Sequence, residues 1–456
     1  MSKTDKLFPK LKEMVGEANV IQDPEKLKAY AIDGKKPKVI VSPGTIDEVS
    51  KIVAYANQQH FIVIPRGNGT KMGMGGIPKK VNIILSTNRL NRITDSDSEN
   101  LTLSAESGIT LSEVQDSLAK LGRGYFLPLD PPFTNQATLG GIVATNSSGP
   151  KRLLYGAARD LIIGTKAVFP NGDMVISGGK TVKNVSGYDM CKLLIGSYGT
   201  LGILCEMTFK LLPLPEKEAT LSLSFGKLEE ADGFVRQLRI SQLIPSSIEI
   251  LNSIAVENMK YPRSMPQNGN YLVTVGLEGV TESIGRQVSE MSEMGKKNGV
   301  LETMTLDSDK HRAFWIALRN FSQGLSEKYP NFIGLKSNLL ISKSGEMLGN
   351  YERIARESGI ECAFICHAGN GILHSYILPG KNFRSRIESF VHFIGGLTSE
   401  AVKNEGNLVV ESSPLSIKKK VDVWGQSRSD YLMVRRLKGQ IDPAGILNTG
   451  RFVGGI

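Results

Sequence analysis

The sequence predicts an α+β protein with more than one domain, and three observations support this prediction. Short apolar runs typical of strands, such as Leu161–Phe169, alternate with amphipathic stretches typical of helices, such as Glu282–Lys297. A chain of 456 residues is long enough for two or three domains, each with its own core. Glycine recurs at nearly every turn from Pro128 to Gly202, and this spacing ends after Pro213 and Pro215, which indicates a change of domain.

The composition excludes several classes of protein. Apolar residues make up 40% of the chain and charged residues 22%, which is typical of globular proteins. Four cysteines predict neither a disulfide framework nor an iron–sulfur or zinc-ribbon site in this chain. The first 16 residues lack the apolar core of a signal peptide, and no run of 18 apolar residues occurs, so we expect a cytoplasmic protein without a transmembrane segment.

The net charge of +10 leaves three interpretations open, namely a solvated basic face, an anionic ligand or an acidic partner surface. Nucleic-acid binding is not expected, because the short basic clusters are not interleaved with aromatic residues.

The N-terminal third begins with helix and strand signals. Residues 5–16 are amphipathic, and Thr45 with Glu48 forms the pattern of a capping box for a helix that runs to about Gln58. A short apolar strand, Phe61–Pro65, leads directly into the glycine-rich segment Pro65–Gly76. A strand followed by such a turn can direct several N–H groups at a phosphate, although the spacing matches neither a P-loop nor a dinucleotide-binding fingerprint.

Further strands are predicted at Val81–Ser86 and Leu101–Ala105, followed by a helix that extends toward Leu121. The glycine-rich stretch that follows has two interpretations. It can be a β-rich domain with many tight turns, or a set of loops whose main-chain N–H groups hold a large cofactor.

Six blocks in residues 38–212 give the chain its resemblance to a known family: PRGNGT, AESGITLSEVQ, ATLGGIVATNSSG, YGAARD, GYD and GSYGTLGI. In order and spacing they resemble the FAD-linked oxidases of the p-cresol methylhydroxylase and vanillyl-alcohol oxidase fold, and most of all the flavin subunits of glycolate oxidase and D-lactate dehydrogenase. The C-terminal stretch from VDVWG to DPAGILNTGRFVGGI resembles the same subunits. The resemblance implies a two-part FAD-binding domain in residues 1–215, an α+β cap domain with an antiparallel sheet and helices on one face in residues 216–405, and a segment, 406–456, that returns to the FAD-binding domain.

The resemblance also implies which residues hold FAD. The loop on the pyrophosphate would be Pro65, Arg66, Gly67, Asn68, Gly69 and Thr70. The flavin and its phosphates would be lined by Thr138, Leu139, Gly140, Gly141, Thr145, Ser148 and Gly149. The adenine half would contact Gly199, Thr200, Gly202 and Ile203. Some relatives attach flavin to a histidine in the first loop, where this chain has Thr70, so non-covalent FAD is expected; Tyr198 replaces a glutamate that many hydroxy-acid dehydrogenases carry.

A second constellation is HAGNGILH, which begins at His367 and ends at His374. If its glycines make a turn between two strands, the two imidazoles can converge on one ion; the alternative is two strand-end histidines bonded to the backbone. The resemblance favours the ion, because related dehydrogenases carry HAGDGNLH here and hold a divalent metal, such as zinc or manganese, with both histidines and a later glutamate. Glu411 occupies the position of that glutamate.

Two departures put the metal site and the base in doubt. Ser412 replaces a histidine that is thought to remove the substrate's hydroxyl proton in relatives, and Asn370 replaces an aspartate. His374 or His392 could replace the missing base. Arg319, which matches an arginine of the family's cap, and Lys343, which follows a predicted strand at Asn338–Ile341, are candidates for binding a carboxylate, the alternative for each being a solvent-exposed role.

These observations together predict an FAD-dependent dehydrogenase that oxidises a small 2-hydroxy acid, glycolate or D-lactate, to the 2-oxo acid by hydride transfer to flavin N5. The resemblance implies that electrons pass to a separate iron–sulfur subunit, through which the protein could associate with a membrane. The alternative is an FAD-binding electron-transfer or accessory subunit that has no hydroxy-acid site of its own.

Overall fold

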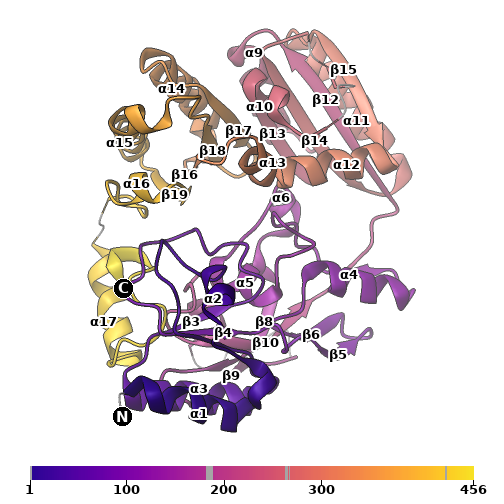
Figure 1. Cartoon of the computed structure of the whole chain (residues 1–456). Helices are drawn as coiled ribbons and strands as arrows, with labels where there is room; N and C mark the ends of the chain where they lie inside the picture. Colours follow the sequence, from indigo (N-terminus) through magenta and orange to yellow (C-terminus); the bar gives the residue numbers. More distant parts are fainter. Residues whose placement is uncertain (1–2, 181–187, 262–264, 267, 427–428) are drawn as a thin grey trace. The chain divides into compact units, whose positions relative to one another are not determined.

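The computed structural model describes residues 3–180, 188–261, 265–266, 268–426 and 429–456, so part of the predicted glycine-rich stretch, 181–187, lies outside the described residues. The chain divides into two compact units (Figure 1). Unit 1 comprises Met1–Ser148, Ala157–Leu214 and Ser427–Ile456, and unit 2 comprises Gly149–Gly156 and Pro215–Gln426. The domain boundaries expected after residues 215 and 405 stay a prediction; the compact units change over at residues 214 and 426.

Unit 1 contains a four-stranded sheet in the order β1-β2-β4-β3, in which β2, β4 and β3 are parallel and β1 is antiparallel to β2. Its strands are β1 (Val20–Ile21), β2 (Val39–Val41), β3 (Val63–Arg66) and β4 (Ile83–Ser86). Helices α1 (Lys3–Val15) and α3 (Ile46–Gln59) cover one face, and α2 (Pro24–Lys28) packs on the other. The predicted start of α3 is confirmed, because the Thr45 hydroxyl accepts a hydrogen bond from the N–H of Glu48.

The second sheet of unit 1 is antiparallel, in the order β5-β6-β10-β8-β9. Its strands are β5 (Ile93–Asp97), β6 (Thr102–Glu106), β8 (Ile162–Val168), β9 (Met174–Gly178) and β10 (Ile203–Lys210). One face packs against α4 (Leu111–Lys120), α5 (Leu139–Thr145), α7 (Ala158–Leu161) and α8 (Met190–Leu194). A small pair, β7 (Tyr125–Phe126) and β11 (Leu212–Pro213), and the C-terminal helix α17 (Asp430–Ile441) complete the unit.

Unit 2 is built on one eight-stranded antiparallel sheet, in the order β15-β12-β14-β13-β17-β18-β16-β19. The strands are β12 (Lys217–Phe225), β13 (Ser247–Asn252), β14 (Tyr271–Gly279), β15 (Glu302–Asp307), β16 (Ile333–Asn338), β17 (Cys362–His367), β18 (Ile372–Ile377) and β19 (Asn407–Ser412). The expected antiparallel sheet is confirmed.

Helices cover both faces of this sheet, which corrects the expectation of helices on one face. The larger core lies under α9 (Leu228–Ile240), α11 (Thr281–Lys297), α14 (Ser344–Glu357) and α15 (Ile387–Lys403). The other face packs against α10 (Ser253–Asn258), α12 (Ser308–Arg319) and α13 (Phe321–Lys328). We call the second the polar face, because its strands also carry buried charged and hydroxyl side chains among the apolar ones. The short helices α6 (Arg152–Tyr155) and α16 (Leu415–Lys418) also belong to unit 2.

The predicted strand at Asn338–Ile341 is wrong. Strand β16 ends at Asn338, and Ile341–Lys343 forms a 3₁₀ turn before α14. The neighbouring strands explain this end, since Asn338 pairs with the first residue of β18 and the first residue of β19. Beyond it, the N–H of Leu339 donates to the carbonyl of Gly371 in the turn before β18, and the strand ends.

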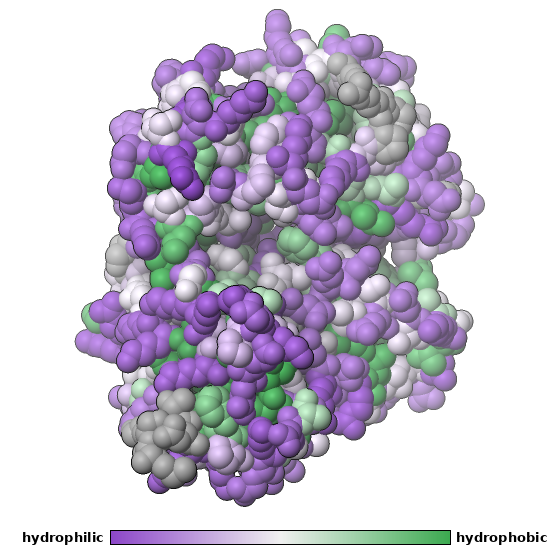
Figure 2. Space-filling model, viewed as in Figure 1, coloured by the Kyte–Doolittle hydropathy of each residue, from purple (hydrophilic) through white to green (hydrophobic). Residues whose placement is uncertain are grey.

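The surface in Figure 2 is mostly hydrophilic, with hydrophobic residues scattered in small groups. Among the described helices, none combines the length and the apolar character that crossing a bilayer requires.

Candidate functional site

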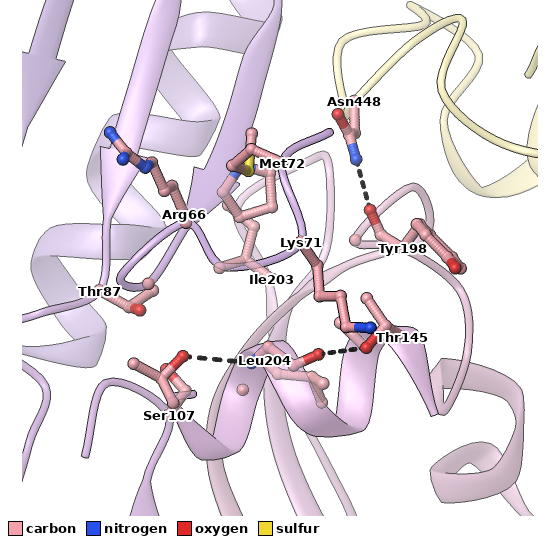
Figure 3. Close-up of a pocket in the computed structure, with 18 of the residues that line it drawn as sticks. Arg66, Lys71, Met72, Thr87, Ser107, Thr145, Tyr198, Ile203, Leu204 and Asn448 are labelled. Carbon is pink, nitrogen blue, oxygen red and sulfur yellow. Dashed lines mark hydrogen bonds between the residues drawn. The ribbon is translucent and has the colours of Figure 1, made fainter. Parts of the chain in front are cut away.

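A pocket in unit 1 lies where the glycine-rich turns meet (Figure 3). It has about 760 Å³ of empty space, part of which is open to solvent. The turn after β3 forms one wall, the start of α5 a second, and the turn before β10 a third. The C-terminal segment contributes Asn448 and Arg451.

The turns approach one another so closely that glycine is required at their contacts. A Cβ atom on Gly67 would lie 2.1 Å from the Thr138 hydroxyl, and one on Gly140 would lie 2.7 Å from Cβ of Ser107. Gly199 has a φ of +66°, and its Cβ would lie 2.6 Å from the ring of Pro65. These contacts bring main chain to the pocket, where its N–H groups can be presented to an extended ligand.

Arg66 places a positive charge at the pocket. Its Nε and Nη1 atoms are buried without a hydrogen-bond partner among the described residues. The guanidinium lies 3.9 Å from the centre of the Tyr30 ring, a cation–π contact. Burial lowers the pKa of Arg66, because removing a cation from water disfavours its charged form. A bound phosphate would supply the missing partner and offset that cost.

The C-terminal segment holds the loops around the pocket through hydrogen bonds and an ion pair. The side-chain amide of Asn448 donates to the carbonyl of Tyr198 (Figure 3). Arg451 donates to the carbonyl of Met72 at 2.8 Å and to that of Gly76 at 3.3 Å. It also forms an ion pair with Asp33 at 3.4 Å. The segment therefore joins the turn after β3 to the turn before β10.

Twelve of the residues predicted to hold FAD line this pocket: Pro65, Arg66, Gly67, Gly69, Thr70, Thr138, Gly140, Gly141, Thr145, Gly199, Gly202 and Ile203. The other five, which are Asn68, Leu139, Ser148, Gly149 and Thr200, are not among the described residues of its lining. Asn68, for example, donates to the carbonyl of Gln136, and Leu139 lies in the core.

The pocket also contains residues that sequence reasoning did not assign: Lys71, Met72, Thr87, Ser107, Ala144, Tyr198, Leu204, Asn448 and Arg451. The GRF sequence near the C-terminus was the available signal for Arg451. Ser107 lies in the block AESGITLSEVQ, whereas Thr87 belongs to none of the six blocks. The buried unpaired donors, the main chain of the turns and the size of the pocket together fit the dinucleotide that the resemblance implies.

In unit 2, the two predicted histidines lie on the polar face of the sheet. The hairpin expected between them is confirmed, since His367 ends β17 and His374 lies in β18. Their rings meet edge to face, with centroids 4.9 Å apart. Nδ1 of His367 is hydrogen-bonded to the carboxylate of Glu249, a fully buried residue of β13.

The predicted glutamate lies on the other side of His374. The Oε2 atom of Glu411 is 3.9 Å from Nδ1 of His374, and the ring of Tyr376 is stacked on that of His374 at 6.0 Å. Burial raises the pKa of Tyr376, and the carboxylates of Glu411 and Glu249 raise it further. We call His367, His374, Glu249 and Glu411 the histidine cluster.

Sequence reasoning found His367, His374 and Glu411 but missed two neighbours on the same face. Glu249 is opposite His367 in the β13–β17 pairing, and Lys336 is opposite His374 in the β16–β18 pairing. Neither residue belongs to a sequence motif. Only the pairing register of the strands places them next to the histidine cluster.

The predicted carboxylate-binding residues lie in different surroundings. Nε of Arg319, at the end of α12, is buried without a partner among the described residues. Phe321, two residues later, packs its ring 5.0 Å from that of Tyr376, so the junction of α12 and α13 lies beside the histidine cluster. Lys343 instead donates to the side chain of Asn404 at 2.9 Å. His392 is exposed on α15, on the opposite face of the sheet.

A second buried network of unit 2 carried no sequence signal. Nζ of Lys151 is 3.0 Å from Glu218 and 2.8 Å from Glu278, and the hydroxyl of Tyr155 donates to Glu278. Although burial acts against the charge, Glu278 and Glu218 raise the pKa of Lys151. A hydrogen bond from His311 and the charge of Lys151 lower the pKa of Glu218 to about 2. The network fixes the segment Gly149–Gly156 within unit 2.

Two imidazoles and a carboxylate are ligand types that zinc and manganese sites use. Among the residues that the structure describes, however, no three His, Cys, Asp or Glu side chains form a group that could hold a metal ion. Metal binding by His367, His374 and Glu411 therefore stays a prediction.

Comparison with known proteins gives matches along most of the chain. The family model described as "FAD binding domain" matches residues 37–178, and the model described as "FAD linked oxidases, C-terminal domain" matches residues 214–452. The glycolate oxidase subunit GlcD of Bacillus subtilis is 28% identical over 422 residues, covering 91% of this chain and 89% of that protein. A D-lactate dehydrogenase of Archaeoglobus fulgidus is 27% identical over 421 residues, covering 91% of each.

Among solved structures, p-cresol methylhydroxylase with substrate bound is similar, with a TM-score of 0.74 and 18% identity, covering 98% of this chain and 96% of that one. The expected p-cresol methylhydroxylase-type fold is confirmed.

Proposed function

The chain belongs to the FAD-linked oxidases, and from this premise we propose that it is an FAD-dependent dehydrogenase of a small 2-hydroxy acid, glycolate or D-lactate. The observation that carries the proposal is the histidine cluster, because it brings two imidazoles and two carboxylates together on one sheet face. The two named relatives act, by their names, on glycolate and D-lactate.

Unit 1 would hold the cofactor without a covalent bond. The main-chain N–H groups of the turn after β3 and of the start of α5 would bind the pyrophosphate together with Arg66. When bound, FAD would accept the α-hydrogen of the substrate as a hydride at N5.

Unit 2 would bind the substrate acid and accept the proton of its hydroxyl group. Arg319, with its buried unpaired Nε, suits the substrate carboxylate, and Lys343 is the second predicted cation. His374 would take the hydroxyl proton, since an imidazole titrates near neutral pH and can act as a general base. Lys336, opposite His374 in the sheet, would add positive charge beside the acid.

A divalent metal on His367, His374 and Glu411 would lower the pKa of the substrate hydroxyl. Because no metal-binding group is formed among the described side chains, the proposed proton transfer uses His374 alone. Metal dependence is a separate prediction, checked by comparing turnover after chelation with turnover after addition of Zn²⁺ or Mn²⁺.

A second candidate function is an electron-transfer or accessory flavin subunit. Asn370 and Ser412, which depart from the residues expected at the two motifs, favour it. Under either function we expect electrons to pass to an iron–sulfur partner.

The visible spectrum of the purified protein, recorded without oxygen, tests the proposal. Addition of D-lactate or glycolate, with and without Zn²⁺ or Mn²⁺, is expected to bleach the flavin absorption. Flavin that stays oxidised with every small hydroxy acid would contradict the dehydrogenase and favour the accessory subunit. A colourless protein that cannot be reconstituted with FAD would contradict both.

A further inference from the structure

Glu249 is a carboxylate that the proposed reaction does not use. It lies in the middle of β13, directly opposite His367 of β17, and no part of its side chain is exposed. The flanking residues Ile248 and Ile250 point into the larger apolar core, so alternation along the strand directs Glu249 to the polar face.

Burying a carboxylate at this depth is costly unless hydrogen bonds compensate for the lost water. The contact with Nδ1 of His367 supplies such a bond. A neutral imidazole carries a single ring proton, so a proton held at Nδ1 for Glu249 leaves Nε2 as an acceptor. Sheet pairing and the hydrogen bond therefore define both the orientation of the ring and its tautomer.

The neighbouring histidine is held differently. The nearest Glu411 oxygen is 3.9 Å from Nδ1 of His374, which is too long for a hydrogen bond. His374 makes ring contacts with Tyr376 and with His367 itself. A hydrogen bond that His367 donates to a fully buried carboxylate fixes its ring.

We propose that Glu249 is a positioning residue, which holds His367 with Nε2 directed to the hydroxyl group of the 2-hydroxy acid. Nε2 then accepts the hydrogen bond of the hydroxyl and orients the substrate's C–O bond. Because a hydroxyl carries a single proton, the O–H turns from Nε2 of His367 to His374 before His374 removes that proton. This role rests on the proposed function for the identity of the ligand. The tautomer of His367 is a property of the chain alone.

Nitrogen NMR of the full-length, FAD-loaded protein with ¹⁵N-labelled histidine tests the tautomer directly. The chain has only five histidines, so the His367 signals can be identified as those missing from a His367→Gln spectrum. We expect the wild type to carry its proton on Nδ1 of His367 and an unprotonated Nε2. A wild-type spectrum with the proton on Nε2 would overturn the proposal without any need for a variant.

Glu249→Leu removes the acceptor while keeping a similar volume, and Glu249→Gln keeps an oxygen that can accept the same hydrogen bond. We expect the leucine variant to lose the Nδ1-protonated signal, and the glutamine variant to retain much of it. The matched control is Glu352→Leu, because Glu352 is a half-buried carboxylate of unit 2 that bonds to Tyr271 instead. It should leave the His367 signals unchanged.

With the acid that reduces the flavin fastest, Glu249→Leu is expected to lower kcat by roughly 10- to 100-fold, by analogy with the loss on removing the partner that orients a metal-ligating histidine. KM should change little, since the carboxylate-binding groups are intact. If the tautomer of His367 and kcat are both unchanged in Glu249→Leu, Glu249 is a structural residue and the proposal is overturned. If the tautomer behaves as expected but no hydroxy acid bleaches the wild type, the proposed function fails and the positioning role stands.

Discussion

The pocket of unit 1 and the histidine cluster of unit 2 are built from different parts of the chain. The pocket is formed by glycine-rich turns that touch one another, with Arg66 as a half-buried cation. The cluster is made of side chains on strands that pair far apart in sequence, such as β13 and β17. A site of the first kind constrains the backbone and tolerates exchange of many side chains. In a site of the second kind, a single substitution can change the chemistry while the fold persists.

Asn370 and Ser412 illustrate this difference. Asn370 donates its N–H to the carbonyl of His367 in the hairpin turn, and Ser412 ends β19 in register with Gly334. The same backbone could also carry the aspartate and the histidine of the relatives. The fold therefore does not reveal the change in side-chain chemistry.

The largest expected effect is on the rate of flavin reduction, which depends on unit 2, and leaves flavin binding by unit 1 unchanged. His374→Gln should lower the rate of flavin reduction by roughly 10²- to 10⁴-fold, the usual contribution of a general base, while the bound flavin stays at the wild-type amount. Stopped-flow absorbance with the best hydroxy acid measures the rate. His392→Gln is the control, since His392 is exposed on the opposite face and should react at the wild-type rate. Equal rates for the two variants would remove His374 from the reaction.

Replacing a glycine by alanine should disrupt the pocket of unit 1 where its turns are in contact. Gly140→Ala places a Cβ 2.7 Å from Cβ and 2.9 Å from the carbonyl oxygen of Ser107, an overpacking cost of about 1–3 kcal/mol. Gly73→Ala, in the turn after β3, meets nothing within 4 Å. We expect FAD affinity to fall roughly tenfold or more in Gly140→Ala and to stay unchanged in Gly73→Ala, as measured by flavin fluorescence titration. Equal affinities would argue against a pocket that depends on main-chain packing.

Acid should weaken unit 2 through its buried network. The pKa of Glu218 is about 2 in the folded protein, against about 4.5 when unfolded, because of His311 and Lys151. This stabilisation is complete above pH 4.5 and is lost as the pH falls toward 2. Allowing for partial exposure of the carboxyl, we expect a contribution of about 2 kcal/mol.

Urea unfolding between pH 6 and pH 3 measures this contribution. Glu218→Gln should be less stable than the wild type at pH 6, and the difference should shrink as the pH falls. Parallel stability curves for the two proteins would show that Glu218 does not have a lowered pKa.

The smallest effect lies outside both regions. Thr45→Ala removes the hydroxyl that caps α3 and should lower the free energy of unfolding by about 1 kcal/mol. Thermal unfolding measures the loss, and we expect both flavin content and turnover to match the wild type. A loss of flavin in this variant would mean that the pocket depends on helix α3 rather than on its own turns.

The sequence predicted well those features that depend on local chemistry. Thr45 identified the start of α3, glycine spacing identified the turns around the pocket, and the HAGNGILH motif identified a hairpin with a histidine on each strand. In each case the physical cause acts over a few residues, so one stretch of sequence contains it.

Features that depend on register across the sheet escaped sequence reasoning. Glu249 lies 118 residues before His367, in an apolar strand with no motif, and only the β13–β17 pairing brings the two together. Likewise, nothing near Lys151 indicates that Glu218 and Glu278 are its partners. The sequence predicts a strand at Asn338–Ile341, whereas the ladder stops at Asn338, where the neighbouring strands β18 and β19 begin.

The central claim is the proposed oxidation of a small 2-hydroxy acid, whose α-hydrogen would pass to FAD. Rapid anaerobic mixing of the FAD-loaded protein with the best acid, carrying either hydrogen or deuterium at C2, tests it most directly. The account predicts that the flavin bleaches with both acids, and more slowly with the deuterated one. Bleaching at the same rate with both, or no bleaching of bound FAD by any hydroxy acid, would contradict it.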